Sequence, residues 1–229
     1  MEHIVIGIEG LVGSGKTSIC RELLSKIPNS VIMHGGNLYR GIVYAFMSKS
    51  KNIKELKNID ITKVMKELDV RIELENNETV VYVGNEKIEE EKLQNKETSM
   101  AVSVASNIAN NIELFIFARN IINNLKEKYN VIVSGRALME IYPDLDYHFF
   151  ITASLEERAK RKLNQYNGEV SLEELKEHIA KRDELQEKSR FYKIYSNTIT
   201  VDVTECKTAL ESTDKVCEYI KETATIYCN

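Results

Sequence analysis

Short apolar runs alternate with amphipathic stretches at the start of the chain. Residues 3–9 are β-branched and nearly continuous in apolar character, which predicts a central strand covered on both faces. From residue 16 the apolar positions recur at helical spacing until Pro28 ends the pattern. Residues 31–33 then predict a second strand and residues 38–47 a second helix. The chain therefore opens as β-α-β-α.

A different pattern appears between residues 70 and 88. Two alternating stretches, 70–75 and 80–83, are separated by an Asn-Asn pair, and a Gly-Asn pair closes the second. Alternation interrupted by turn residues is typical of antiparallel strands. We therefore expect a small antiparallel insert within an otherwise α/β chain.

The remainder of the chain returns to strands that alternate with helices. The pattern predicts helices over 96–128 and 208–223 and strands at 131–133, 147–152 and 198–203. Two capping boxes, Ser154 to Glu157 and Ser171 to Glu174, mark two further helix starts. Such alternation implies a parallel sheet with right-handed crossovers, so the predicted fold class is α/β.

Length, charge and cysteine content narrow the class of protein. With 229 residues one domain is expected, and a net charge of −4 argues against a nucleic-acid partner. The first residues carry no basic region, and Gly7 and Glu9 interrupt the apolar run, so we expect no signal peptide, no membrane span and a cytoplasmic location. The four cysteines, Cys20, Cys206, Cys217 and Cys228, are expected to be reduced thiols.

The stretch after the first strand carries the strongest chemical signal. Residues 10–17 match GxxxxGK[ST], the phosphate-binding loop, in which successive backbone N–H groups point inward. Lys16 would place a cation on the β- and γ-phosphates of ATP, and the Thr17 hydroxyl would ligate Mg²⁺. The predicted nucleotide-binding residues are Gly10, Gly13, Ser14, Gly15, Lys16, Thr17 and Ser18.

Several further runs carry a resemblance over nearly the whole chain. They are Gly36-Asn37-Leu38-Tyr39-Arg40, Leu68-Asp69-Val70-Arg71, Val104-Ala105-Ser106, Ser134-Gly135-Arg136, Ser154-Leu155-Glu156-Glu157-Arg158-Ala159 and Ala180-Lys181-Arg182-Asp183. With these runs the chain resembles the bacterial cytidylate kinases. The resemblance implies one P-loop kinase domain over residues 1–229, with an acceptor-binding insert at about 35–112 and a helical lid at about 154–172. It also implies phosphoryl transfer from ATP to CMP or dCMP with Mg²⁺.

The resemblance also assigns roles to individual residues. It implies catalytic roles for Lys16, Arg158, Arg161 and Arg182, and acceptor binding by Arg40, Ser106 and Arg136. Arg158 and Arg161 are three apart, which on a helix places both guanidiniums on one face, able to converge on phosphates. Without the loop, a solvated helix face would be the better explanation of this basic stretch, which comprises Arg158, Lys160, Arg161 and Lys162.

The chain departs from the family pattern on the acceptor side. His34-Gly35-Gly36 stands where the family has Asp-Ser-Gly, and Phe115, Ala137 and Gln186 replace charged residues that would contact the base or the sugar. Ser189 stands where the family has an arginine. A lost charged hydrogen-bond partner costs about 1.5–3 kcal/mol, so discrimination among acceptors is expected to be weakened.

Three hypotheses therefore stand. The first is an ATP-dependent kinase of CMP or dCMP, the second a kinase of this fold with another phosphorylated acceptor, and the third a nucleotide-binding protein that transfers no phosphate. Glu9 could support Mg²⁺ or could simply end the first strand. Nucleotides are the expected partners, and a monomer is favoured.

Overall fold

The computed structural model describes residues 3–49, 61–95, 97–98, 101–102, 112–163, 170–188 and 193–221. Predictions that concern Ser106, Ser189 and Cys228 lie outside these residues.

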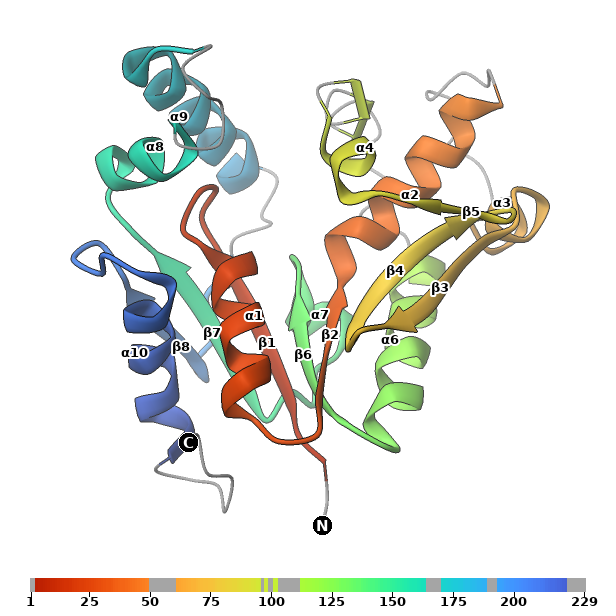
Figure 1. Cartoon of the computed structure of the whole chain (residues 1–229), viewed down its shortest axis with the longest axis horizontal. Helices are drawn as coiled ribbons and strands as arrows, with labels where there is room; N and C mark the ends of the chain where they lie inside the picture. Colours follow the sequence, from red (N-terminus) through yellow and green to blue (C-terminus); the bar gives the residue numbers. More distant parts are fainter. Residues whose placement is uncertain are drawn as a thin grey trace.

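The described strands form one mixed sheet (Figure 1). Its order is β3-β4-β2-β6-β1-β7-β8, with β5 beside β4. The parallel strands are β1 (Val5–Gly10), β2 (Ser30–His34), β6 (Asn130–Ser134), β7 (Tyr147–Thr152) and β8 (Thr198–Asp202). The antiparallel strands are β3 (Val70–Glu75), β4 (Glu78–Val83) and β5 (Glu86–Ile88). The predicted α/β class with a small antiparallel insert is confirmed.

Helices cover both faces of the parallel strands. The described helices are α1 (Lys16–Lys26), α2 (Gly35–Ser48), α3 (Ile61–Glu67), α4 (Glu90–Gln94), α6 (Ile112–Lys126), α7 (Leu138–Ile141), α8 (Leu155–Leu163), α9 (Leu172–Lys188) and α10 (Ala209–Lys221). One apolar core joins α2, α3, α6 and α7 to the sheet, and a second joins α1 and α10 to its other face. Because side chains alternate along a strand, β1 sends Val5 into the first core and Ile6 and Ile8 into the second.

The antiparallel insert is continuous with the main sheet. Asn76 and Asn77 both adopt positive φ, as a two-residue hairpin turn between β3 and β4 requires. The Ile32 amide of β2 donates to the Asn77 carbonyl at 2.8 Å, and β4 runs parallel to β2 at this point. The insert also shares the first apolar core, through residues such as Val81. The insert is therefore an extension of the main sheet and not a separate unit.

The two capping boxes begin α8 and α9 as predicted. The Glu157 amide donates to Ser154 Oγ at 3.3 Å and the Glu174 amide to Ser171 Oγ at 3.2 Å. The two helices stand above the carboxyl end of the sheet, opposite α2 and α4 (Figure 1). They share a third apolar core with the phosphate-binding loop, formed by Val12, Ala159, Leu175 and Ile179.

Helix α7 was not predicted, and it begins after Ala137, whose φ of 53° lies in the left-handed region. The described cysteines, Cys20, Cys206 and Cys217, are buried and form no disulfide among themselves, in agreement with the expectation of thiols. Within the described residues, no helix has the length and apolar character needed to cross a bilayer. The cytoplasmic location stays a prediction.

Candidate active site

The loop between β1 and α1 has a backbone that suits glycine. Gly10 has φ 143°, and a Cβ on it would lie 2.1 Å from the Ile151 carbonyl oxygen of β7. Gly13 has φ 79°, and a Cβ there would approach the Arg158 carbonyl oxygen to 3.0 Å. Both positions combine a left-handed backbone with a close neighbour, so larger residues would strain the loop. The sequence motif therefore forms a compact turn of the kind that can cradle a phosphate.

Lys16 opens α1 directly after this loop. Its Nζ donates to the carbonyl oxygens of Gly10 at 2.9 Å and Leu11 at 2.7 Å. Burial, followed by the positive charge of Arg136, lowers the pKa of Lys16 to about 7. The other predicted nucleotide contacts follow the motif: Thr17 is half-buried, Ser18 is exposed, and Ser14 Oγ is buried without a hydrogen-bond partner among the described residues.

Five cations gather at the carboxyl end of the sheet, and we name Lys16, Arg40, Arg136, Lys162 and Arg182 the cation cluster. Burial and then Arg136 and Arg182 lower the pKa of Arg40 to about 10. Burial and then Arg182 and Arg40 also lower the pKa of Lys162. Three members thus hold their charge less readily than in water because of burial and mutual repulsion. Bound anions would relieve this repulsion.

Arg40 shows most directly that the cation cluster has too little negative charge around it. It lies in α2, and its Nε is buried without a hydrogen-bond partner among the described residues. Among the described residues, Glu90 is the carboxylate that counters the lowering of its pKa. A buried donor of a charged group is costly unless it is paired, so an anionic ligand is the natural partner of Arg40 Nε.

The structure groups some of the predicted residues and separates others. Arg40, Arg136 and Arg182, predicted from the resemblance, lie with Lys16 in the cation cluster. Sequence reasoning left Lys162 within a basic stretch of uncertain role, although its position one helical turn after Arg158 was the available signal. The predicted catalytic and binding roles of these residues stay predictions.

The guanidinium groups of Arg158 and Arg161 donate hydrogen bonds to other groups of the protein. Arg158 is 5% exposed and donates to the carbonyl oxygens of Ala153 and Val12 and to Asp183 Oδ2 at 2.9, 3.1 and 2.6 Å. Arg161 donates to the carbonyl oxygens of Ser14, Val203 and Cys206 at 3.3, 2.8 and 3.0 Å. Both arginines therefore connect α8 to the backbone of the phosphate-binding loop.

The structure describes the surroundings of several divergent positions. Gln186 is 7% exposed, and its Oε1 is buried without a hydrogen-bond partner in the described part of the chain. Ala137 lies in the left-handed region next to Arg136, and Phe115 is half-buried on α6. A Cβ on Gly35 would be 3.4 Å from the Ser134 carbonyl oxygen, which is an ordinary van der Waals contact. The expectation of weakened base and sugar recognition stays a prediction.

Glu9, at the end of β1, is 3% exposed and already has partners. Its Oε1 accepts a hydrogen bond from the Leu138 amide at 2.5 Å and lies 3.4 Å from His148 Nε2. Glu9 thus holds the start of α7, next to the loop that carries Arg136. A role in supporting Mg²⁺ stays a prediction.

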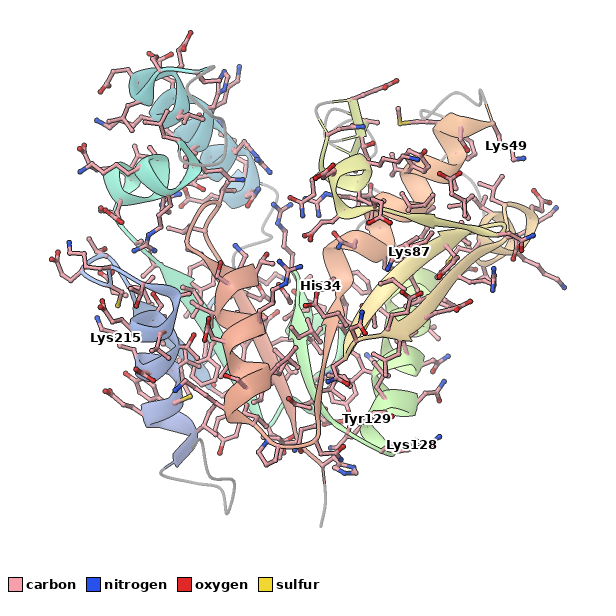
Figure 2. The ribbon with its side chains drawn as sticks, in the orientation of Figure 1. His34, Lys49, Lys87, Lys128, Tyr129 and Lys215 are labelled. Carbon is pink, nitrogen blue, oxygen red and sulfur yellow. The ribbon has the colours of Figure 1, made fainter. Side chains whose placement is uncertain are left out.

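His34, labelled in Figure 2, is the last residue of β2 and helps to connect α1 to the antiparallel insert. Its Nε2 is 2.8 Å from Glu78 Oε2, and the other oxygen of Glu78 accepts from Arg21 Nε at 3.0 Å. Arg21 also pairs with Glu90 at 3.0 Å. These contacts tie α1, β2, β4 and α4 together beside the cation cluster.

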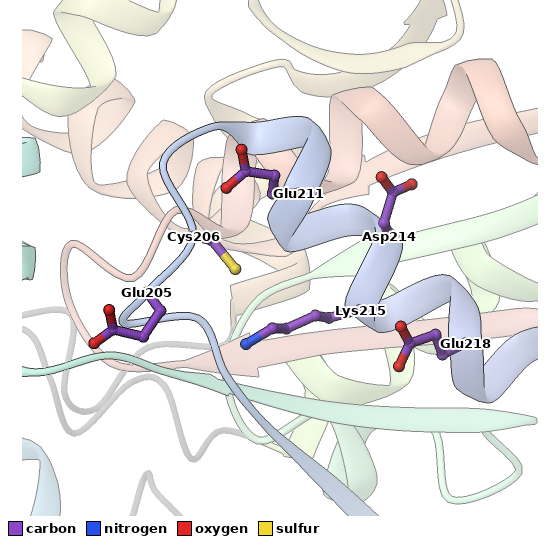
Figure 3. A pocket seen from close by; sticks show the side chains of 6 residues that line it. All are labelled: Glu205, Cys206, Glu211, Asp214, Lys215 and Glu218. Atoms are coloured by element: carbon purple, nitrogen blue, oxygen red, sulfur yellow. The ribbon is translucent and has the colours of Figure 1, made fainter.

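A separate pocket lies between the loop after β8 and α10 (Figure 3), and it is acidic. Lys215 donates there to the Asp202 carbonyl oxygen at 2.9 Å. The lining residues are Glu205, Cys206, Glu211, Asp214, Lys215 and Glu218. Four carboxylates would repel a polyphosphate, so we do not assign phosphate binding to this pocket.

Comparison with known proteins agrees with this site. A glycine-rich loop at the head of a parallel sheet, faced by converging cations, defines a nucleotide-binding protein of the P-loop kinase class. A family model described as cytidylate kinase matches residues 6–225. The chain belongs to the cytidylate kinase family.

Individual relatives align over nearly their full length. The chain is 29% identical to a cytidylate kinase of Caldanaerobacter subterraneus, covering 96% of this chain and 95% of the relative. It is 30% identical to a cytidylate kinase of Borreliella burgdorferi, with 96% of each covered. A solved structure of an uncharacterized protein from Eubacterium ventriosum shares the fold, with a TM-score of 0.50 at 17% identity over 96% of this chain and 99% of the other.

Proposed function

We propose that this protein transfers the γ-phosphoryl group of ATP to CMP or dCMP, giving ADP and the nucleoside diphosphate. The observation that carries the proposal is the cation cluster, because it presents converging positive charge beside a phosphate-binding loop. One loop suits one polyphosphate, whereas Arg40 and Arg136 lie on other elements and suit a second anion. Membership of the cytidylate kinase family supports the choice of acceptor.

The residues of the loop fit a nucleoside triphosphate with Mg²⁺. The tight turn at Gly10 and Gly13 leaves room for oxygens close to the backbone, and Ser14 Oγ lacks a partner among the described residues. Thr17, in the first turn of α1, would hold Mg²⁺ through its hydroxyl. The ion would neutralise charge on the β- and γ-phosphates when bound.

Phosphoryl transfer requires little covalent chemistry from the protein. The reactants must be aligned and the charge on the transferring group neutralised, which contributes several kcal/mol of transition-state stabilisation. Lys16 would serve the ATP phosphates, Arg40 and Arg136 the acceptor phosphate, and Arg182 the group in transit. Ser106 would contact the base.

We assign acceptor binding to the insert at about residues 35–112 and closure over ATP to the lid at about 154–172. The assignment of the insert is supported by Arg40 on α2. The assignment of the lid is supported by α8, which carries Lys162 and packs on the loop through the third apolar core. Closure would exclude water and limit hydrolysis of ATP.

The test is coupled ATP consumption with CMP, dCMP, UMP, AMP and small phosphorylated metabolites as acceptors. Lys16→Ala provides the blank, because it removes the cation at the loop. We expect turnover with CMP or dCMP, together with measurable turnover of UMP because Phe115, Ala137 and Gln186 weaken discrimination. Turnover confined to a non-nucleotide acceptor would refute the proposed substrate, and ATP binding without turnover of any acceptor would refute the reaction.

A further inference from the structure

The phosphate-binding loop is held from behind by two side chains of α8. Arg158 Nη1 donates to the Val12 carbonyl oxygen at 3.1 Å, and Arg161 Nη1 donates to the Ser14 carbonyl oxygen at 3.3 Å. The two acceptors are alternate peptide groups of the loop. Each arginine also has contacts elsewhere, so neither guanidinium is a freely moving surface group.

The orientation of these carbonyls fixes the orientation of the next amides. In a trans peptide the C=O of one residue and the N–H of the next point in opposite directions, and the described chain contains no cis peptide. The Val12 carbonyl faces Arg158, so the Gly13 N–H faces away from it. By the same argument the Gly15 N–H faces away from Arg161.

Burial makes the Arg158 contact rigid. The Arg158 guanidinium is almost fully buried, and Asp183 Oδ2 of α9 accepts from it at 2.6 Å. A Cβ on Gly13 would lie 3.3 Å from Arg158 Cβ, so the loop rests directly on α8. Val12 adds apolar contacts with both α8 and α9. A buried, charge-assisted hydrogen bond of this kind is stronger and more directional than an exposed one.

We propose that Arg158 and Arg161 are positioning residues, which hold the Val12 and Ser14 carbonyls outward so that the Gly13 and Gly15 amides are aimed at the ATP phosphates before ATP binds. This role rests on the proposed function, because ATP is the ligand whose phosphate oxygens would accept hydrogen bonds from these amides. It differs from the role implied by the resemblance, in which both guanidiniums contact phosphate.

On both α8 and α9, one residue supports the loop and its neighbour in sequence belongs to the cation cluster. On α9, Asp183 supports Arg158, and the preceding residue, Arg182, belongs to the cation cluster. On α8, Arg161 supports the loop and the following residue, Lys162, acts on Arg182 and Arg40. Adjacent helical residues project about 100° apart, so one face of each helix holds the loop while the next faces the ligands.

The first test reads the loop amides in the nucleotide-free protein by NMR. With ¹⁵N-glycine and ¹³C-carbonyl valine, the Val-Gly pairs of the sequence are Val12-Gly13 and Val83-Gly84, so two peaks are selected. With ¹³C-carbonyl serine they are Ser14-Gly15 and Ser134-Gly135. We expect Arg158→Lys to shift or broaden the Gly13 peak and leave Gly84 unchanged. Arg161→Lys should act in the same way on Gly15.

The matched control is Lys160→Met on the same helix. The Lys160 side chain is 53% exposed and pairs with Glu156 at 3.2 Å, so its loss should leave both loop peaks unchanged. If Arg158→Lys does not fold, Asp183→Asn replaces it, because it weakens the support of Arg158 and should shift Gly13 less strongly. Unmoved Gly13 and Gly15 peaks in the folded variants would refute the proposal.

The second test is the affinity for MgATP by calorimetry. We expect the Kd of Arg158→Lys to rise about tenfold, which corresponds to about 1.4 kcal/mol. A shifted Gly13 peak with unchanged affinity would refute the claim that the aimed amides matter for ATP. A lost affinity with unmoved peaks would instead place the guanidinium on the phosphates. Since the amide readout needs neither nucleotide nor acceptor, it remains decisive even if CMP is not the substrate.

Discussion

Arg40 provides the sharpest test of the cation cluster, because removal of its partly buried charge should make the ligand-free protein more stable. Its pKa is lowered from 12.5 to about 10, and one pKa unit corresponds to about 1.4 kcal/mol. The fold therefore holds this charge at a cost of about 3 kcal/mol, mainly from burial and then from Arg136 and Arg182. Arg40→Met keeps most of the aliphatic stem, and we expect a gain of about 1–3 kcal/mol in the free energy of unfolding.

Urea unfolding at pH 7 with and without inorganic phosphate measures this effect. Phosphate should stabilise the wild type more than Arg40→Met, because the ligand supplies the missing negative charge. Arg119→Met is the matched control: Arg119 donates to the carbonyl oxygens of Ile141 at 2.7 Å and Glu140 at 3.3 Å, so its removal should destabilise by about 2 kcal/mol. Equal destabilisation by both variants would refute the anion-site reasoning, since it would show that Arg40 is already satisfied by protein groups.

Two further predictions concern acid stability and the loop backbone. Burial raises the pKa of the Glu78 carboxyl, but the hydrogen bonds from Arg21 and His34 outweigh burial and lower the pKa below 4.5. The charged carboxylate therefore stabilises the fold above pH 4.5, and this stabilisation is lost as the pH falls through the lowered pKa. Glu78→Gln should therefore be less stable at pH 7 and should lose less stability than wild type on acidification, and matching acid-unfolding curves would contradict this. Gly10→Ala should destabilise by more than about 3 kcal/mol because its Cβ meets the Ile151 carbonyl oxygen, whereas Gly84→Ala, with φ 61° and no neighbour within 4 Å, should cost about 1 kcal/mol in urea unfolding.

The fold could be predicted because its signals are local. Residues 3–9 are apolar on both faces and precede a loop motif, so the strand, the turn and the start of α1 follow without knowledge of the tertiary structure. The hydroxyl and glutamate of each capping box gave the starts of α8 and α9 for the same reason. Helix α7 was not predicted because it is one turn long and depends on a hydrogen bond that the Leu138 amide donates to Glu9, 129 positions earlier in the chain.

The site could be predicted only as a set of residue types. The sequence showed a run of cations on α8, but helical spacing does not say which of them faces the loop and which faces the ligand. Packing decides this: Val12 and Ala159 draw one side of α8 against the loop and bury Arg158 there, which leaves Lys162 beside Arg40 and Arg182. Long-range contact, rather than spacing, therefore separates supporting residues from ligand-facing ones.

The separate apolar cores indicate which part of the molecule unfolds at the lowest free energy. The insert and the sheet share one core, whereas α8 and α9 bury their apolar faces in a small separate one with Val12. Regions that share a core lose structure together, and a small satellite core can open at lower free energy. We therefore expect α8 and α9 to unfold before the rest of the molecule. Each such opening would release the phosphate-binding loop, while the insert and the main sheet stayed folded.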